Sequence, residues 1–175
     1  DATAVFNMLS GYSEPEVWNK LSLAPLWLRD RFEFLIKREI SNAKAGKKAF
    51  IKAKMNSLCD KKIISLLYEA SQAGVKIDLI IRGICCLRAG IPGLSENITV
   101  RSIVGAFLEH SRIFYFCNGG KDEVYMGSAD WMPRNLDKRV EILFPVEDDK
   151  LKEEVIEVLN IQLSDTLKAH ILKDN

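Results

Sequence analysis

The sequence has little of what marks a secreted, membrane-spanning or metal-binding protein. Its 175 residues include only four cysteines and two histidines. No apolar run approaches the roughly 18 residues of a membrane-spanning helix. The cysteines form no Cys-x-x-Cys pair, no histidine stands near them at ligand spacing, and no signal peptide precedes them. We therefore expect a soluble protein with reduced thiols in the cytoplasm and no metal site of its own.

The chain also lacks a strong net charge, since its formal charge is only +1. This value argues against a histone-like polyanion binder. The charges are nevertheless unevenly placed, because residues 37–62 are strongly basic and residues 147–157 are strongly acidic. A hydrophobic content of 47% over this length predicts one domain with a sizeable core. The chain begins with Asp1, which suggests a piece of a longer protein.

Helical and strand patterns alternate along the first half of the chain. Apolar residues recur at helical spacing over 26–45, and an alternating strand pattern over 48–55 places its lysines on one face. Asp60 predicts the start of a second helix that ends at Gly74, and an apolar strand follows over 75–81. This order predicts a right-handed βαβ unit whose ligands bind beyond the carboxyl ends of parallel strands.

The second half predicts antiparallel strands. Strands are expected over 98–103 and 139–144, the latter as the last strand, and Asp148 or Asp149 should cap a final helix. Between them, 113–117 and 123–126 are β-branched and aromatic runs separated by glycine, which predicts a β-hairpin. The fold class is therefore α/β, with a mixed sheet flanked by helices.

The hairpin brings polar residues from distant positions together. With the turn centred near Gly120, His110 lies opposite Asp130 and Arg112 lies opposite Ser128. An imidazole, a guanidinium, a hydroxyl and a carboxylate then meet at one sheet edge. This grouping suits phosphoryl chemistry.

Further candidates flank this group. Arg82 follows a strand at its carboxyl end and precedes a glycine-rich loop, which favours an anion contact. Lys54, Asn56 and Arg134 could extend a basic lining, although alternating lysines are also ordinary on an edge strand. Aromatic residues near the hairpin are expected in the core or at its rim, and the cysteines are expected to serve packing.

Three segments carry a resemblance to a known family. The pattern His-x-Arg with Gly-Ser-x-Asp approximates the His-x-Lys and Gly-Ser-x-Asn pattern of the phospholipase D superfamily, with arginine replacing lysine. The segments IRGICCLRAGIPGLSEN (81–97), FLEH (107–110) and GSADWMPRN (127–135) resemble the C-terminal region of type 1 polyphosphate kinase. Residues 1–22 would then be a lead-in from the preceding domain, and 23–175 the C-terminal phospholipase D-like domain.

The resemblance implies a reversible transfer of the ATP γ-phosphate to polyphosphate. In this family the transfer uses magnesium and passes through a phosphohistidine in an upstream domain, which this sequence lacks. Arg82 and His110 match the family residues that contact the nucleotide phosphates. The family's adenine contacts and magnesium-coordinating arginines would lie upstream, so this part would hold neither ATP nor Mg²⁺ by itself and would be inactive alone.

The expected partners are ATP or ADP, inorganic polyphosphate and the upstream domains of the same chain, in a homo-oligomer without nucleic acid. Membrane association of the intact enzyme is left open. One alternative is a phosphodiesterase or nuclease that uses His110 as nucleophile and needs a dimer, because the chain carries one such motif. Another is a non-catalytic module that binds polyanions.

Overall fold

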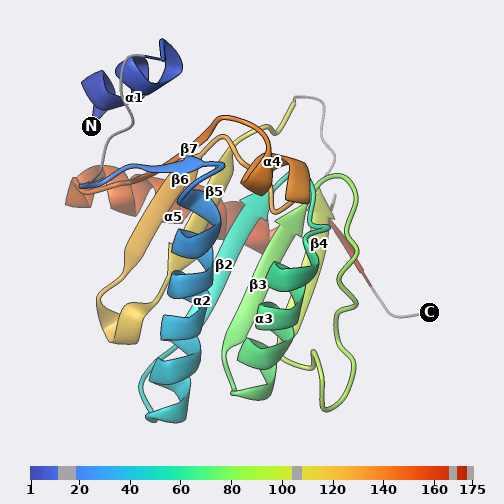
Figure 1. Ribbon diagram of the computed structural model, residues 1–175. Helices are drawn as coiled ribbons and strands as arrows, with labels where there is room; N and C mark the ends of the chain where they lie inside the picture. The colour runs from blue at the N-terminus through green and yellow to red at the C-terminus, as the bar shows by residue number, and fades with distance from the viewer. Residues whose placement is uncertain (12–18, 104–107, 166–168, 173–175) are drawn as a thin grey trace.

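The protein is a three-layer structure in which helices cover both faces of one sheet. The computed structural model describes residues 1–11, 19–103, 108–165 and 169–172. Eight strands form a single sheet in the order β1-β7-β6-β5-β2-β3-β4-β8. Helices α2 and α3 pack on one face and α5 on the other (Figure 1). In chain order the elements are α1 (Ala2–Leu9), β1 (Ser22–Ala24), α2 (Leu28–Lys44), β2 (Phe50–Met55), α3 (Lys61–Gln72), β3 (Lys76–Ile81), β4 (Ile98–Ile103), β5 (Arg112–Phe116), the 3₁₀ turn η1 (Asn118–Gly120), β6 (Glu123–Gly127), α4 (Pro133–Asp137), β7 (Glu141–Pro145), α5 (Asp149–Ser164) and β8 (Ala169–Ile171).

The predicted βαβ unit is present at the centre of the sheet. Strands β2, β3 and β4 are parallel, and α3 forms the crossover between the first two. The Asp60 carboxylate accepts a hydrogen bond of 3.0 Å from the backbone amide of Ile63, which fixes the first turn of α3. The apolar face of α3 is buried against the sheet. The Asp60 cap and the apolar face thus fix where α3 begins and which side of it packs on the sheet.

The hairpin of β5 and β6 has a register one residue away from the predicted one. Arg112 pairs with Gly127 instead of Ser128. The reason lies in the turn, where Asn118, Gly119 and Gly120 all have positive φ values and form a 3₁₀ turn. This conformation moves the centre of the turn to the Gly119–Gly120 peptide, because Phe116 pairs with Glu123.

The lysines of β2 do not lie on an edge strand. Strand β2 sits between β5 and β3, so the edge-strand explanation for its alternating lysines is wrong. Lys54 is 3% exposed and Lys52 donates a hydrogen bond of 2.8 Å to Asn160 of α5. Both lysines belong to the sheet face that α5 covers.

Several other expectations about the second half need correction. Strand β7 begins at Glu141, two residues later than predicted, and it is not the last strand because β8 follows α5. The short edge strands β1 and β8 were not predicted. Asp148 caps α5 as expected, but only Leu159 of its apolar residues is fully buried. No helix in the described ranges is both long and apolar enough to cross a membrane.

A buried ion pair joins the two helices on the front face of the sheet. Arg29 of α2 donates hydrogen bonds of 2.9 and 2.7 Å to the Asp60 carboxylate and also binds Asp137 of α4. Burial alone would raise the pKa of Asp60, but the hydrogen bonds from Arg29 and the Ile63 amide outweigh it and hold the pKa below its usual value. Asp60 therefore remains charged and links α2, α3 and α4.

Replacing Arg29 by Met should lower the free energy of unfolding by about 3 kcal/mol at pH 7, because Asp60 is left buried and unpaired. The contribution of Asp60 is present above its unfolded pKa of about 3.9 and is lost as pH falls through the lower folded pKa. The loss should therefore shrink at about pH 3, because burial without Arg29 raises the pKa of Asp60 in the variant and lets the carboxyl take up a proton. Urea unfolding at both pH values tests this. Lys37→Met, which breaks an exposed pair with Glu33, is the control and should cost less than about 1 kcal/mol.

Candidate functional site

The predicted residues gather beyond the carboxyl ends of β2 and β3. Asn56 follows β2, and Arg82 follows β3. His110 precedes β5, which enters the sheet from this same edge because it runs antiparallel to β2. Asp130 follows β6, and the arrowheads of β2 and β3 point to this end of the molecule, where α4 also lies (Figure 1). The topology thus brings four separate segments to one edge.

Asp130 is the polar centre of this edge. Its Oδ1 atom accepts hydrogen bonds from the backbone amide of Asn56 at 2.9 Å and from Nε of Arg112 at 3.0 Å. The carboxylate is buried, so these charge-assisted bonds replace the water that it loses. Asp130 therefore ties the end of β2 to the beginning of β5.

Arg82 is positioned by Asn56. Its Nε and Nη2 atoms donate hydrogen bonds of 2.9 and 2.6 Å to Oδ1 of Asn56. The backbone of the next residue is held as well, because the Gly83 amide donates to the Asn56 carbonyl at 2.7 Å. Nη1 of Arg82 has no partner among the described residues and remains a donor for an anion.

His110 is exposed, and its backbone is the part that the edge holds. Nη1 of Arg112 donates a hydrogen bond of 2.9 Å to the His110 carbonyl. In the described part of the chain no side chain bonds the imidazole, so Asp130 acts on His110 only through Arg112 and the backbone. Neither Asp130 nor a backbone group of the described residues forms a direct hydrogen bond with the imidazole. The imidazole ring is exposed to solvent, so a ligand can reach it.

Lys54 is engaged within the protein. Its ammonium donates hydrogen bonds to Glu109 at 3.1 Å and to the Ser111 hydroxyl at 2.6 Å. Gln162 of α5 donates to the same Glu109 carboxylate at 3.0 Å. The structure thus pairs Lys54 with two residues that flank His110. Sequence reasoning missed Glu109 and Ser111, although the antiparallel pairing of Lys54 with Ile113 brings them near.

Among the described residues, Ser128 and Arg134 form no hydrogen bond with the Arg112–Asp130 ion pair. The Ser128 hydroxyl donates to Glu141, and it accepts a bond of 3.1 Å from the Ile142 amide. Glu141 is a buried carboxylate that sequence reasoning also missed, and it fixes Ser128 at the start of the β6–β7 connection. Arg134 is exposed on α4 at the same end of the sheet.

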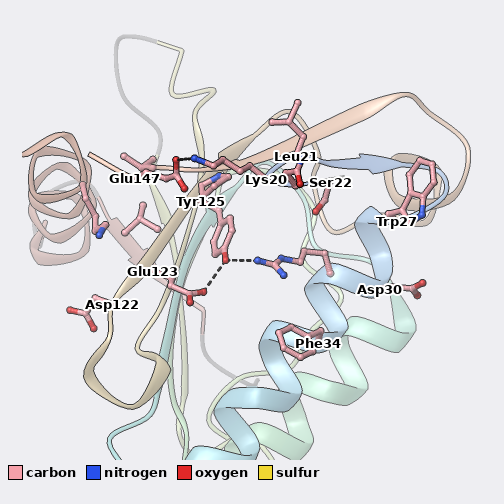
Figure 2. A pocket seen from close by; sticks show the side chains of 16 residues that line it. Lys20, Leu21, Ser22, Trp27, Asp30, Phe34, Asp122, Glu123, Tyr125 and Glu147 are labelled. Atoms are coloured by element: carbon pink, nitrogen blue, oxygen red, sulfur yellow. Dashed lines mark hydrogen bonds and ion pairs between the residues drawn. The ribbon is translucent and has the colours of Figure 1, made fainter. Parts of the chain in front are cut away.

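The largest cavity described lies elsewhere, between α2 and the β6–β7 side of the sheet (Figure 2). It has a volume of about 790 Å³, and none of the sequence-predicted site residues lines it. Tyr125 accepts a hydrogen bond from Arg31 and donates one to Glu123 (Figure 2). Burial raises the pKa of Tyr125, and its hydrogen bond to Glu123 adds to this effect. Arg31, Tyr125 and Glu123, which line this cavity, are therefore bonded to one another.

The described residues offer little that could bind a metal ion. No group of three or more histidines, cysteines, aspartates or glutamates among them is arranged to hold a metal ion. The buried carboxylates at the edge are instead bonded to amides, a guanidinium and hydroxyls. The residues of this edge do not fit a Mg²⁺ site.

The fold defines the class of protein. The solved structure of a phospholipase D family member, Nuc from Salmonella typhimurium, has a TM-score of 0.63 and 15% identity to this chain. The likeness covers 89% of this chain and 97% of that one. At this identity it shows the fold alone, and it confirms the prediction of a phospholipase D-like α/β domain with a mixed sheet.

The family follows from closer relatives. Residues 21–175 match the family described as Polyphosphate kinase C-terminal domain 2, and the chain belongs to this family. Polyphosphate kinase from Halalkalibacterium halodurans is 59% identical over 169 residues, which are 97% of this chain and 24% of the relative. The crystal structure of polyphosphate kinase from Porphyromonas gingivalis has a TM-score of 0.95 and 47% identity, covering 99% of this chain and 26% of that one. The chain thus spans about a quarter of the length of these relatives.

Replacing Asp130 by Ala should lower the free energy of unfolding by about 3–5 kcal/mol, because Arg112 and the Asn56 amide lose their shared acceptor. Asp130→Asn keeps an oxygen at this position and should cost less, about 1–2 kcal/mol. Chemical denaturation measures both changes. Glu157→Ala, at an exposed position of α5, is the control and should stay within about 0.5 kcal/mol. An Asp130→Ala protein as stable as this control would contradict the central role of Asp130.

Proposed function

We propose that this domain supplies phosphate-binding residues to the catalytic site of a polyphosphate kinase. The intact enzyme would transfer the ATP γ-phosphate reversibly to polyphosphate through a phosphohistidine in an upstream domain. It would act in the cytoplasm as a homo-oligomer, with ATP or ADP and polyphosphate as partners and without nucleic acid. The family membership of the chain supports the kinase reaction, and the residues at the sheet edge support the phosphate-binding role.

Arg82 is proposed to hold a β- or γ-phosphate oxygen. Asn56 fixes the guanidinium from one side and leaves Nη1 as a donor among the described residues. A guanidinium whose orientation is already set loses less entropy when it binds phosphate. Arg82 would therefore neutralise charge on the nucleotide without much rearrangement.

His110 is proposed to bind or protonate an equatorial or leaving oxygen of the transferring group. Its exposed imidazole stands beside a backbone that Arg112 and Asp130 hold in place. An imidazole can donate or accept a proton near neutral pH, which suits this role.

The second-rank residues divide into two groups. Asn56, Arg112 and Asp130 would act as positioning residues, because they hold Arg82 and the His110 backbone. Lys54 and Ser128 are bonded to buried or half-buried carboxylates, so they would support the edge from within. Arg134, exposed on α4, would be a peripheral phosphate contact. Phosphoryl transfer needs mainly positioning and charge neutralisation, which such a set can supply.

One observation carries this proposal. Hydrogen bonds run without interruption from Arg82 through Asn56, Asp130 and Arg112 to the His110 backbone. The segment that follows β3 and the segment that leads into β5 are thereby held together at one edge. Magnesium would be held by the nucleotide phosphates and by residues outside this domain, since this edge does not fit it.

In the intact enzyme, His110→Ala and Arg82→Ala should each reduce the rate of polyphosphate synthesis by at least about 100-fold, since each removes transition-state stabilisation. Arg82→Lys keeps the charge without the planar fork and should fall between Arg82→Ala and the native enzyme. Steady-state assays with ATP and polyphosphate measure these effects.

Two matched controls accompany these variants. His170→Ala removes an exposed histidine of β8, and Lys76→Ala removes an exposed cation at the opposite end of β3 from Arg82. Both should retain near-native turnover. Near-native turnover of His110→Ala would refute the proposed role of the imidazole.

The phospholipase D-like fold makes a phosphodiesterase the second candidate function. We expect the 175-residue chain alone to leave a chromogenic phosphodiester intact and to make no polyphosphate, because the phosphohistidine would lie outside it. If the chain is only a polyanion-binding module, it should bind polyphosphate in a salt-dependent manner while His110→Ala leaves the intact enzyme active. Phosphodiester hydrolysis that disappears in His110→Ala would favour the nuclease reading.

A further inference from the structure

Two cysteines from different loops, Cys59 and Cys86, lie at neighbouring positions of a β-bridge close to Arg82. Leu58 and Cys85 form a parallel β-bridge outside the named strands. The Leu58 amide donates to the Ile84 carbonyl at 2.9 Å, and the Cys86 amide donates to the Leu58 carbonyl at 2.8 Å. Cys59 and Cys86 are the next pair in this register, so their side chains leave the bridge on the same side. Neighbouring parallel segments lie about 4.8 Å apart, within the range of Cα separations that a disulfide spans.

The thiols of this pair differ in their surroundings. Burial, with the neighbouring Cys86 thiol adding to the effect, raises the pKa of Cys59 to about 11. Cys59 is partly buried, whereas Cys86 is exposed. A soluble oxidant therefore meets Cys86 first, with Cys59 beside it as a resolving thiol. The neighbouring Cys85 points instead to the Leu87 carbonyl, at 3.6 Å from its Sγ.

The loops that carry this pair also carry the phosphate-binding candidates. Cys59 lies three residues after Asn56, and Cys86 lies four residues after Arg82. The loops are in close contact, since a Cβ at Gly83 would lie 3.0 Å from the Asn56 carbonyl oxygen. A covalent link between the two cysteines would join these loops directly.

We propose that Cys59 and Cys86 form a reversible disulfide modification site that takes hydroperoxides as its oxidant. The Cys86 thiolate attacks one peroxide oxygen, the O–O bond breaks and hydroxide leaves, which forms a sulfenic acid on Cys86. Cys59 then loses its proton and attacks the Cys86 sulfur; the S–S bond forms, the S–O bond breaks and water leaves. Two thiols are oxidised, and one hydrogen peroxide is reduced to two waters.

The bond would stabilise the sheet edge. It closes a loop of about 28 residues that includes α3 and β3. Restricting the unfolded chain in this way corresponds to a rise in Tm of roughly 5–10 °C for a domain of this size. A small-molecule thiol would reverse the link by exchange, because Cys86 is exposed.

The test begins with the reduced protein and stoichiometric hydrogen peroxide, followed by peptide mapping under non-reducing conditions. We expect a cross-linked peptide pair containing Cys59 and Cys86, an intact mass lower by two hydrogens, and the Tm rise given above. Dithiothreitol should restore the reduced mass and Tm. Cys85→Ser should still form the link, whereas Cys59→Ser and Cys86→Ser should not.

The mapping needs no variant, so a poorly folded mutant does not weaken it. A Cys85–Cys86 bond, a dimer joined through Cys86, or sulfinic acid at Cys86 without the cross-link would each overturn the proposal. The readout is a mass and a melting temperature and does not involve polyphosphate. The modification site therefore stands or falls separately from the proposed phosphate-binding function.

Discussion

A single carboxylate oxygen organises the edge of the sheet that carries the candidate site. Oδ1 of Asp130 accepts from the Asn56 amide and from the Arg112 guanidinium, and the group is buried. The buried carboxylate has already lost its water, so the loss of either partner would leave its charge without compensation. The two partners and their strands therefore keep fixed positions. The orientation of Arg82 by Asn56 and the backbone of His110 both depend on this arrangement.

Several charged groups near Asp130 are paired with other groups of the protein. This pairing determines which groups remain for a ligand. Lys54 is bonded to Glu109, and Glu141 is bonded to Ser128 and Asn135. These groups satisfy one another within the protein and add little to an anion-binding surface. Arg82 and His110 are different, because one keeps a donor without a described partner and the other exposes its ring. An edge built in this way offers few but well-placed contacts, which fits the proposed phosphate-binding role.

Local signals could be predicted from the sequence, whereas pairings across the chain could not. The Asp60 cap, the βαβ unit and the place of Arg82 follow from spacing within short segments, and the structure confirms them. The hairpin register differs by one residue because it depends on three positive φ values in the turn. Strands β1 and β8 have three residues each, too few for an alternating pattern. The burial of Lys54 depends on partners more than fifty residues away.

The replacement of lysine by arginine in the His-x-Arg motif bears on the choice between kinase and phosphodiesterase. Arg112 places Nε on Asp130 and Nη1 on the His110 carbonyl, so two of its donors serve the fold. A phosphodiesterase that uses His110 as nucleophile would need a cation of the same hairpin for the substrate phosphate. Nη2 of Arg112 and Nη1 of Arg82 are both without a described partner, and Arg82, which follows β3, is oriented by Asn56 at the end of β2. This division of donors favours the proposed phosphate-binding role, with Arg82 as the main contact and Arg112 as a positioning residue, over a phosphodiesterase that relies on the hairpin cation.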